Sequence, residues 1–273
     1  MEFDDLSARG LVLLGCGKMG SALLEGWLKQ GLPAGAVWVL DPHPSDWLRA
    51  RAAEGLHLNE DLPAAPALVL LAVKPQLMDE ALPQVTGFVD GQTLFVSIAA
   101  GKTLGYFAAH LGAGAPVVRS IPNTPAAVGR GITALIGNDT VDEAGLALAE
   151  TLLSAVGQTV RLDDETQMDA VTAVSGSGPA YVFHLIETLA KAGEAAGLPP
   201  DMAIKLARAT VAGAGQLAEE AAEDPAQLRI NVTSPGGTTA AALAVLMDPE
   251  TGFPPLLEKA VAAATARGKE LGA

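Results

Sequence analysis

Residues 11–20 read LVLLGCGKMG and constrain the fold of this chain more than any other stretch. An apolar run ends in Gly15, Gly17 and Gly20, in the spacing G-x-G-x-x-G, and a helical pattern follows at residues 21–30. A strand, a glycine loop and a helix in this order are typical of a dinucleotide-binding unit. Gly15 would make the tight turn, Gly17 would let the backbone approach a pyrophosphate, and Gly20 would allow close helix packing. The pyrophosphate would lie on the helix N-terminus.

Further apolar runs predict a sheet. We expect strands at residues 11–14, 37–40, 68–73, 94–98, 117–121, 133–136 and 159–162, with a helix at 141–156. Repeated strand and helix units with short connections favour a doubly wound, mostly parallel sheet of the Rossmann type. Ligands bind at the carboxyl ends of such strands, where this sequence has polar or small residues. These residues are Ala72, Val73 and Lys74 at the end of one strand, and Ala99 and Ala100 after the next.

Asp41 ends the second predicted strand, about 21 positions after Gly20. An acidic side chain there can accept hydrogen bonds from an adenosine ribose 2'-OH and repels a 2'-phosphate, so Asp41 favours NADH. Two alternatives stay open. Asp41 and Pro42 can form an ordinary Asp-Pro turn, and a protonated His43 can accommodate a phosphate.

The strand signals stop after Asp163. From there we expect only helices, at residues 165–196, 201–222, 239–247 and 253–271. This shift predicts a nucleotide-binding domain of residues 1–163 and an all-helical domain of residues 164–273. The helices are apolar over more than one face, so we predict dimerisation through them.

Residues 231–248, NVTSPGGTTAAALAVLMD, form a second candidate binding site. Pro235 fixes one φ angle, two glycines permit unusual ones, and Thr238 or Thr239 can cap the helix that follows. The unbonded amides at such a helix start, the helix dipole and the hydroxyl groups of Ser234, Thr238 and Thr239 can receive a carboxylate. The alternative is an ordinary capped helix start.

Residues 175–181, SGSGPAY, predict a distortion in the first long helix. Pro179 lacks the N–H that would bond the carbonyl of Ser175, so the helix should kink or leave that carbonyl free. A glycine-rich helix crossing and a ligand contact both explain the small residues, and the two are compatible.

Composition narrows the class of protein. A net charge of −14 argues against nucleic acid and anionic membranes as partners. We expect no signal peptide and no membrane span, and hence a cytoplasmic protein. The single cysteine, Cys16, excludes an internal disulfide framework and is expected to be a small filler. The four histidines show no metal-ligand spacing, so we expect no metal site.

The motifs GCGKMG, LAVKPQ, IPNTPA, SGSGPAY and SPGGTT, in this order and at these separations, resemble those of the pyrroline-5-carboxylate reductases. The resemblance spans nearly the whole chain. It implies a Rossmann domain, a helical dimerisation domain and the NAD(P)H-dependent reduction of 1-pyrroline-5-carboxylate to L-proline, the last step of proline biosynthesis. It also implies dimers that commonly assemble into decamers.

The resemblance implies a set of contacts. Those with the cofactor fall on Gly17, Lys18, Met19, Ala72, Val73, Lys74, Pro75, Ala99, Ala100 and Asn231. Those with the substrate fall on Glu165, Ser234, Gly237, Thr238 and Thr239. The loop before Glu165 is one residue longer than the family pattern, and Asp41 replaces the serine or threonine of many NADPH-preferring members.

Reduction of a cyclic imine requires a protonated or hydrogen-bonded ring nitrogen. We expect Thr239 to make that hydrogen bond, while an iminium already formed in water or a water relay supplies the proton. Three alternatives stay open: a reductase of the β-hydroxyacid dehydrogenase type, another imine reductase, and a dinucleotide-binding redox sensor without turnover. The first would need a lysine on the long helix, and residues 181–189 contain none.

Overall fold

The computed structural model describes residues 3–89 and 92–272, and its contacts divide the chain into two compact units. The first unit runs up to Gly176 and includes the end of the chain from Thr265 onward. The second unit spans Ser177–Ala264.

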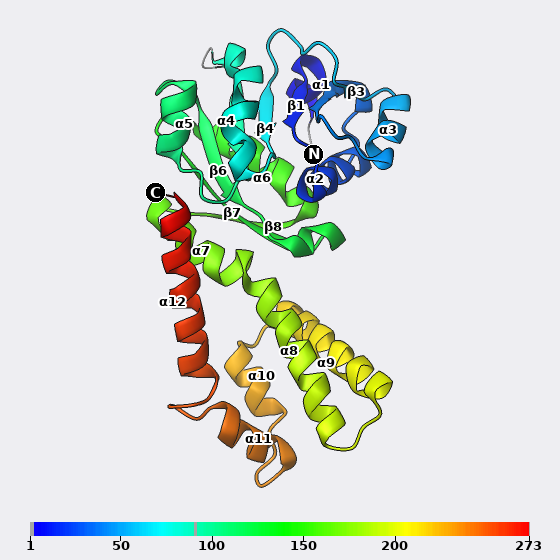
Figure 1. Ribbon diagram of the computed structural model, residues 1–273, viewed down its shortest axis with the longest axis vertical. Coiled ribbons are helices and arrows are strands. Elements are labelled where there is room, and N and C mark those ends of the chain that lie inside the picture. The colour runs from blue at the N-terminus through cyan, green and yellow to red at the C-terminus, as the bar shows by residue number, and fades with distance from the viewer. Residues whose placement is uncertain (1–2, 90–91, 273) are drawn as a thin grey trace. The chain divides into compact units, whose positions relative to one another are not determined.

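A sheet flanked by helices forms the first unit (Figure 1). Within the described residues its strands are β1 Leu11–Leu14, β2 Val37–Leu40, β3 His57–Leu58, β4 Leu68–Leu71, β5 Leu94–Ser97, β6 Val117–Ile121, β7 Gly131–Gly137 and β8 Gly157–Arg161. Its helices are α1 Asp4–Arg9, α2 Lys18–Lys29, α3 Asp46–Ala53, α4 Met78–Ala81, α5 Leu104–Leu111, α6 Glu143–Leu153 and α7 Met168–Val171.

The strands lie in the order β3-β2-β1-β4-β5-β6-β7-β8, and all neighbours pair in parallel except β6 and β7. The order from β3 to β6, with β1 next to β4, is that of doubly wound dinucleotide-binding folds. The predicted doubly wound, mostly parallel sheet is therefore confirmed. The two-residue strand β3 was not predicted, because its sequence has no apolar run.

Alternate residues of the central strands pack on opposite faces of the sheet, as expected for a strand buried on both sides. Leu11 and Leu13 of β1 belong to one apolar cluster, which includes Trp27 of α2. Val12, between them, belongs to the other cluster together with Phe107 of α5. Helices therefore cover both faces, and the loops at the strand ends are left for binding.

The prediction of one continuous helix at residues 165–196 is wrong. A 3-10 turn at Glu165–Gln167, α7, a π-helical turn at Thr172–Gly176 and α8 (Gly178–Ala195) take its place. Pro179 lies in the first turn of α8, where proline is tolerated. The Ser175 carbonyl, which Pro179 cannot bond, accepts a hydrogen bond of 3.1 Å from Asn123 Nδ2. The predicted distortion is confirmed, and a side chain satisfies the carbonyl.

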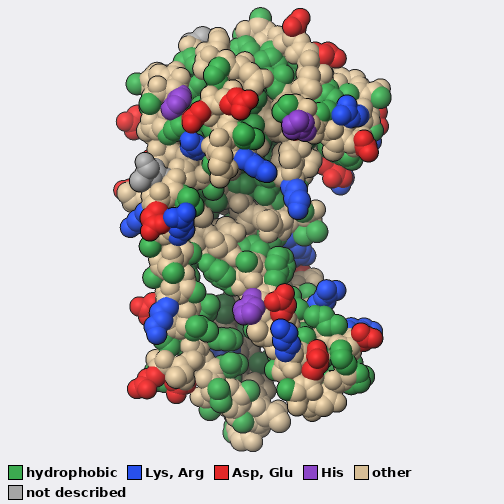
Figure 2. All heavy atoms as spheres, in the orientation of Figure 1, with side chains coloured by type: hydrophobic (Ala, Val, Ile, Leu, Met, Phe, Trp, Pro, Cys, Tyr) green, Lys and Arg blue, Asp and Glu red, His purple; other side chains and the backbone are tan. Residues whose placement is uncertain are grey.

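The second unit consists of α8, α9 (Pro200–Glu220), α10 (Pro225–Asn231), α11 (Thr238–Leu246) and most of α12 (Phe253–Gly272). Among its described residues, the buried apolar side chains are Ala190, Ala203 and Ala207. Many larger ones are exposed, including Phe183 and Leu206, and Figure 2 shows hydrophobic side chains on the surface of these helices. The described helices include none long and apolar enough to cross a membrane.

Candidate active site

Three glycines shape the turn between β1 and α2, each for a different reason. Gly15 has a φ of +87°, and a Cβ there would lie 2.8 Å from Val73 Cγ1. A Cβ on Gly20 would lie 2.7 Å from the Gly15 carbonyl oxygen. Gly17 is the N-cap of α2, and a Cβ there would meet no atom of the described residues within 4 Å. The turn is tightly packed at Gly15 and Gly20 and open at Gly17, where a phosphate could approach the helix amides.

Three loops meet at the carboxyl edge of the sheet because β1, β4 and β5 are neighbours. Backbone hydrogen bonds join the loop starts to the sheet: Ala72 N donates to Leu14 O at 2.8 Å, and Ile98 N to Leu71 O at 3.2 Å. The structure thereby brings together most of the predicted cofactor contacts. These are Gly15, Gly17, Lys18, Met19 and Gly20 after β1, Ala72, Val73, Lys74 and Pro75 after β4, and Ala99 and Ala100 after β5.

The Asp41 carboxylate, directly after β2, accepts hydrogen bonds from two backbone amides. Its Oδ2 atom accepts from Cys16 N at 2.8 Å and its Oδ1 atom from His43 N at 2.8 Å. One oxygen thus binds the backbone of the glycine loop, while the other accepts the hydrogen bond that closes the Asp-Pro turn. Because each carboxylate oxygen has two lone pairs, these bonds leave acceptor capacity for a ribose hydroxyl.

Asn59 is a site residue that the sequence pattern did not reveal. It has a φ of +54°, a conformation that asparagine tolerates better than most residues. Its Oδ1 accepts from Asp41 N and its Nδ2 donates to Asp41 O, both at 2.9 Å. Asn59 therefore fixes the backbone from which the Asp41 carboxylate projects.

Cys16 is buried between two glycines of the turn. Burial, and to a lesser extent the Asp41 carboxylate, raise the pKa of its thiol to about 12. The thiol therefore stays protonated at neutral pH, which agrees with the predicted filler role.

Glu165 makes its bonds within the first unit. Its Oε1 atom accepts from Arg119 Nη1 at 2.6 Å and from Leu104 N at 2.8 Å. The Arg119 side chain lies in β6 and is only 5% exposed. Arg119 is a second residue that sequence reasoning missed, although a charged side chain inside an apolar strand is a signal that could have revealed it.

The predicted acid-binding turn lies in the second unit. Gly236 has a φ of +69°, and Gly237 N donates to the Ser234 carbonyl at 3.1 Å. The prediction that Thr238 or Thr239 caps the helix is wrong. The turn brings Gly237 into the extended N-cap conformation, so both threonines lie in the first turn of α11. Among the described residues, no side chain caps the start of α11, so the first amides of this helix remain available to an anion.

Asn231, the remaining predicted cofactor contact, is the last residue of α10 in the second unit. It is exposed, and its Oδ1 accepts a hydrogen bond of 2.7 Å from Gln227 Nε2. The structure therefore leaves the predicted site residues in two groups, one in each unit.

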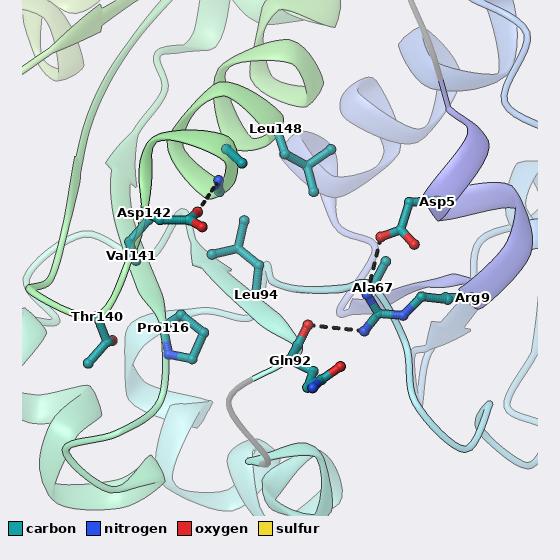
Figure 3. Close-up of a pocket in the computed structure, with 12 residues that line it drawn as sticks. Asp5, Arg9, Ala67, Gln92, Leu94, Pro116, Thr140, Val141, Asp142 and Leu148 are labelled. Carbon is teal, nitrogen blue, oxygen red and sulfur yellow. Dashed lines mark hydrogen bonds and ion pairs between the residues drawn. The ribbon is translucent and has the colours of Figure 1, made fainter.

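A pocket of about 340 Å³ lies at the amino ends of β4, β5 and β6, away from these loops (Figure 3). Leu94, Val141 and Leu148 contribute its apolar wall. Its charged groups bind protein atoms: Arg9 pairs with Asp5 at 3.2 Å, and Asp142 caps α6 through a bond of 2.8 Å. Since ligands of doubly wound sheets bind at the carboxyl ends, this pocket is not the cofactor site.

Comparison with known proteins identifies the family. A family model described as pyrroline-5-carboxylate reductase dimerisation matches residues 165–271. One described as NADP oxidoreductase, coenzyme F420-dependent, matches residues 11–101. The pyrroline-5-carboxylate reductase of Pseudomonas aeruginosa is 41% identical over 97% of this chain and 98% of its own length. The chain belongs to the pyrroline-5-carboxylate reductase family.

Other members of the pyrroline-5-carboxylate reductase family also match over nearly the whole length of both chains. The enzyme of Pisum sativum is 37% identical over 96% of this chain and 95% of its own length. The Coxiella burnetii structure has a TM-score of 0.90 at 33% identity, covering 97% of this chain and 99% of that one. A Plasmodium falciparum structure with NADP bound has a TM-score of 0.82 at 27% identity, covering 98% and 99%.

These matches confirm the predicted family, the Rossmann-type fold and the class of enzyme, an NAD(P)-dependent oxidoreductase acting on a C=N bond. A dimerisation model over the C-terminal helices also supports the predicted self-association.

Proposed function

We propose that this chain reduces 1-pyrroline-5-carboxylate to L-proline with a reduced nicotinamide dinucleotide. Family membership together with the glycine turn carries the proposal. When bound, the nicotinamide supplies a hydride. The residues fit such a cofactor, because the space beside Gly17 is open and adjoins the first amides of α2, which have no partner within their helix. A phosphate could occupy this space. The loops after β1, β4 and β5 would hold the dinucleotide, and Asn231 is the further cofactor contact that the resemblance implies.

The substrate is proposed to bind at the turn of Gly237, with its carboxylate on the amides of Thr238 and Thr239 and on the hydroxyl of Ser234. This helix start carries partial positive charge from the helix dipole. The attraction of the carboxylate is confined to this site, since the chain as a whole is strongly acidic and repels anions. The Thr239 hydroxyl would donate a hydrogen bond to the ring nitrogen. A hydroxyl is too weak an acid to be the source of the proton, which comes from the iminium or from water.

The direct test is an assay of the purified chain. We expect 1-pyrroline-5-carboxylate to cause oxidation of the reduced nicotinamide, followed by its near-ultraviolet absorbance, with formation of proline. An enzyme that binds the nucleotide but never oxidises it with this substrate would contradict the proposal and favour a redox sensor.

We further propose NADH as the preferred cofactor, supported by the acidic side chain at the end of β2. Asp41→Ser should lower the KM for NADPH relative to that for NADH, because the repulsion of a 2'-phosphate is removed. Steady-state kinetics with both cofactors, on wild type and variant, measure this. An unchanged ratio would remove Asp41 from cofactor selection.

The functional domains are proposed to be residues 1–163 and 164–273, supported by the start of the dimerisation model at residue 165. We also propose that dimers assemble into a decamer, as the resemblance implies, and that the enzyme is cytoplasmic. Sedimentation of the purified chain measures the assembly.

A further inference from the structure

The loop after β5, residues 98–103, is held at its far end by a carboxylate from a distant part of the chain. This segment is called the β5 loop below. It ends where α5 begins. The first amide of that helix, Leu104 N, donates a hydrogen bond of 2.8 Å to Glu165 Oε1. Such first-turn amides have no partner within their own helix. The Thr103 hydroxyl oxygen caps the same helix by accepting from Tyr106 N at 3.0 Å. Glu165 therefore adds a second cap, one that reaches across 61 residues of sequence.

The Glu165 carboxylate is itself fixed by Arg119. The bond from Arg119 Nη1 to Glu165 Oε1 is 2.6 Å long, and the arginine side chain is almost completely buried in β6. The neighbouring Arg119 Nε is buried without a hydrogen-bond partner among the described residues, so loss of the Glu165 carboxylate would leave a second nitrogen of this buried guanidinium without its acceptor. A rigid strand thus sets the position of the carboxylate, and the carboxylate sets the start of α5.

The middle of the β5 loop lies close to the end of α12. Gly101 has a φ of +77°, and a Cβ there would lie 3.2 Å from the carbonyl oxygen of Leu271, near the end of α12. Both residues belong to the first unit. The loop therefore lies between two segments that come late in the sequence, at Glu165 and at Leu271.

We propose that Glu165 and Arg119 are positioning residues for the dinucleotide, holding the β5 loop in the conformation that the cofactor contacts. This inference rests on the proposed function, which places Ala99 and Ala100 of the loop at the cofactor. It differs from the contact with substrate that the resemblance implies for Glu165. Both observed bonds of this carboxylate lead to protein donors that fix the nucleotide side of the site.

The sharpest test removes the backbone donor at the start of α5. Leu104→Pro deletes the amide that donates to Glu165, and the proline ring takes the place of the donated hydrogen, so the carboxylate can no longer bind the start of this helix. Proline is tolerated at the first position of a helix, and Thr103 already has an extended ψ of 163° that suits a following proline. Leu104→Ala is the matched control, because it loses the side chain and keeps the amide. The dissociation constant of NADH, measured by fluorescence titration without substrate, is the readout.

We expect Leu104→Pro to raise the NADH dissociation constant about ten-fold, since a hydrogen bond to a charged group is lost, and Leu104→Ala to raise it less than about two-fold. Glu165→Ala should act like Leu104→Pro. Glu165→Gln should recover most of the affinity, because its amide oxygen can still accept from Leu104 N. Glu150→Ala is a second control: Glu150 pairs with Arg161 at 2.7 Å and is 27% exposed, against 30% for Glu165.

Equal NADH affinity in Leu104→Pro and Leu104→Ala would overturn the inference. So would a Glu165→Ala enzyme that binds NADH normally and shows only a raised KM for the imine, because Glu165 would then be a substrate contact. Melting temperatures separate a general loss of stability from the effect on binding, which is measured well below the transition. The titration needs no imine, so a chain that binds NADH without reducing pyrroline-5-carboxylate would refute the proposed function and leave this test intact.

Discussion

Individual residues of the glycine turn have separable roles, which two substitutions can distinguish. Gly20→Ala places a Cβ 2.7 Å from the Gly15 carbonyl oxygen, so the backbone must shift and the free energy of unfolding should fall by about 1–3 kcal/mol. The Cβ of Gly17→Ala would meet no atom within 4 Å in the part of the chain that the structure describes, so this variant should leave the melting temperature unchanged and raise the NADH dissociation constant. Calorimetry and fluorescence titration measure the two effects. A loss of stability in Gly17→Ala equal to that in Gly20→Ala would contradict these roles.

The Thr239 hydroxyl is predicted to act on the ring nitrogen. Thr239→Ala should lower kcat/KM about ten- to a hundred-fold, the effect of losing one hydrogen bond worth about 1–3 kcal/mol. Far-ultraviolet circular dichroism should show an intact fold, and Thr239→Ser, which keeps the hydroxyl, should retain most of the activity. An unchanged kcat/KM in Thr239→Ala would remove this residue from the mechanism.

The sequence alone could not show which residues that are far apart in the chain bind each other. Arg119 and Glu165 are 46 positions apart, and Asp41 and Cys16 are 25 apart. Each residue type was visible in the sequence, and Asp41 was even assigned to the site. Their partners depend on the order of strands in the sheet, which no local pattern contains. The same holds for Asn123, whose amide satisfies the carbonyl that Pro179 leaves unbonded.

Strands and helices with a regular hydrophobic pattern were predicted from the sequence, and short or distorted ones were not. Continuous runs such as LVLL, which occurs in β1 and again in β4, identified the buried strands because both faces of a central parallel strand are covered. The seven-residue helix α10 was missed, since it is shorter than two full hydrophobic periods. Periodicity also could not show that residues 172–176 form a π-helical turn, because the distortion shifts the register by a single residue.

One hydrogen bond joins helices α2 and α6 on the same face of the sheet. Trp27 Nε1 donates to the Leu152 carbonyl oxygen at 2.8 Å, and the indole is fully buried. Trp27→Phe loses this bond and some volume, so we expect the free energy of unfolding to fall by about 2–4 kcal/mol in urea titrations. Trp47→Phe, on the partly buried α3, is the control and should change it by less than about 1 kcal/mol. Equal effects would show that the bond between the helices contributes little.

The second unit leaves too much apolar surface uncovered for an isolated chain. Met202 and Leu206 of α9 are each 50% exposed and lie one helical turn apart. We therefore predict at least a dimer in sedimentation equilibrium at micromolar concentration, and weaker association in Leu206→Lys, which places a charge on this face. Glu219→Lys, near the end of the same helix, controls for the added charge. A monomeric wild type would contradict the prediction.

We propose that the nucleotide and the cyclic imino acid, whose expected sites are the carboxyl edge of the sheet and residues 234–239, react directly with each other. Reduction with NADH that carries deuterium at both positions of nicotinamide C4 tests this claim. We expect one deuterium in the proline formed, at the ring carbon that was the imine carbon. Proline without deuterium, or with the label lost to water, would contradict it.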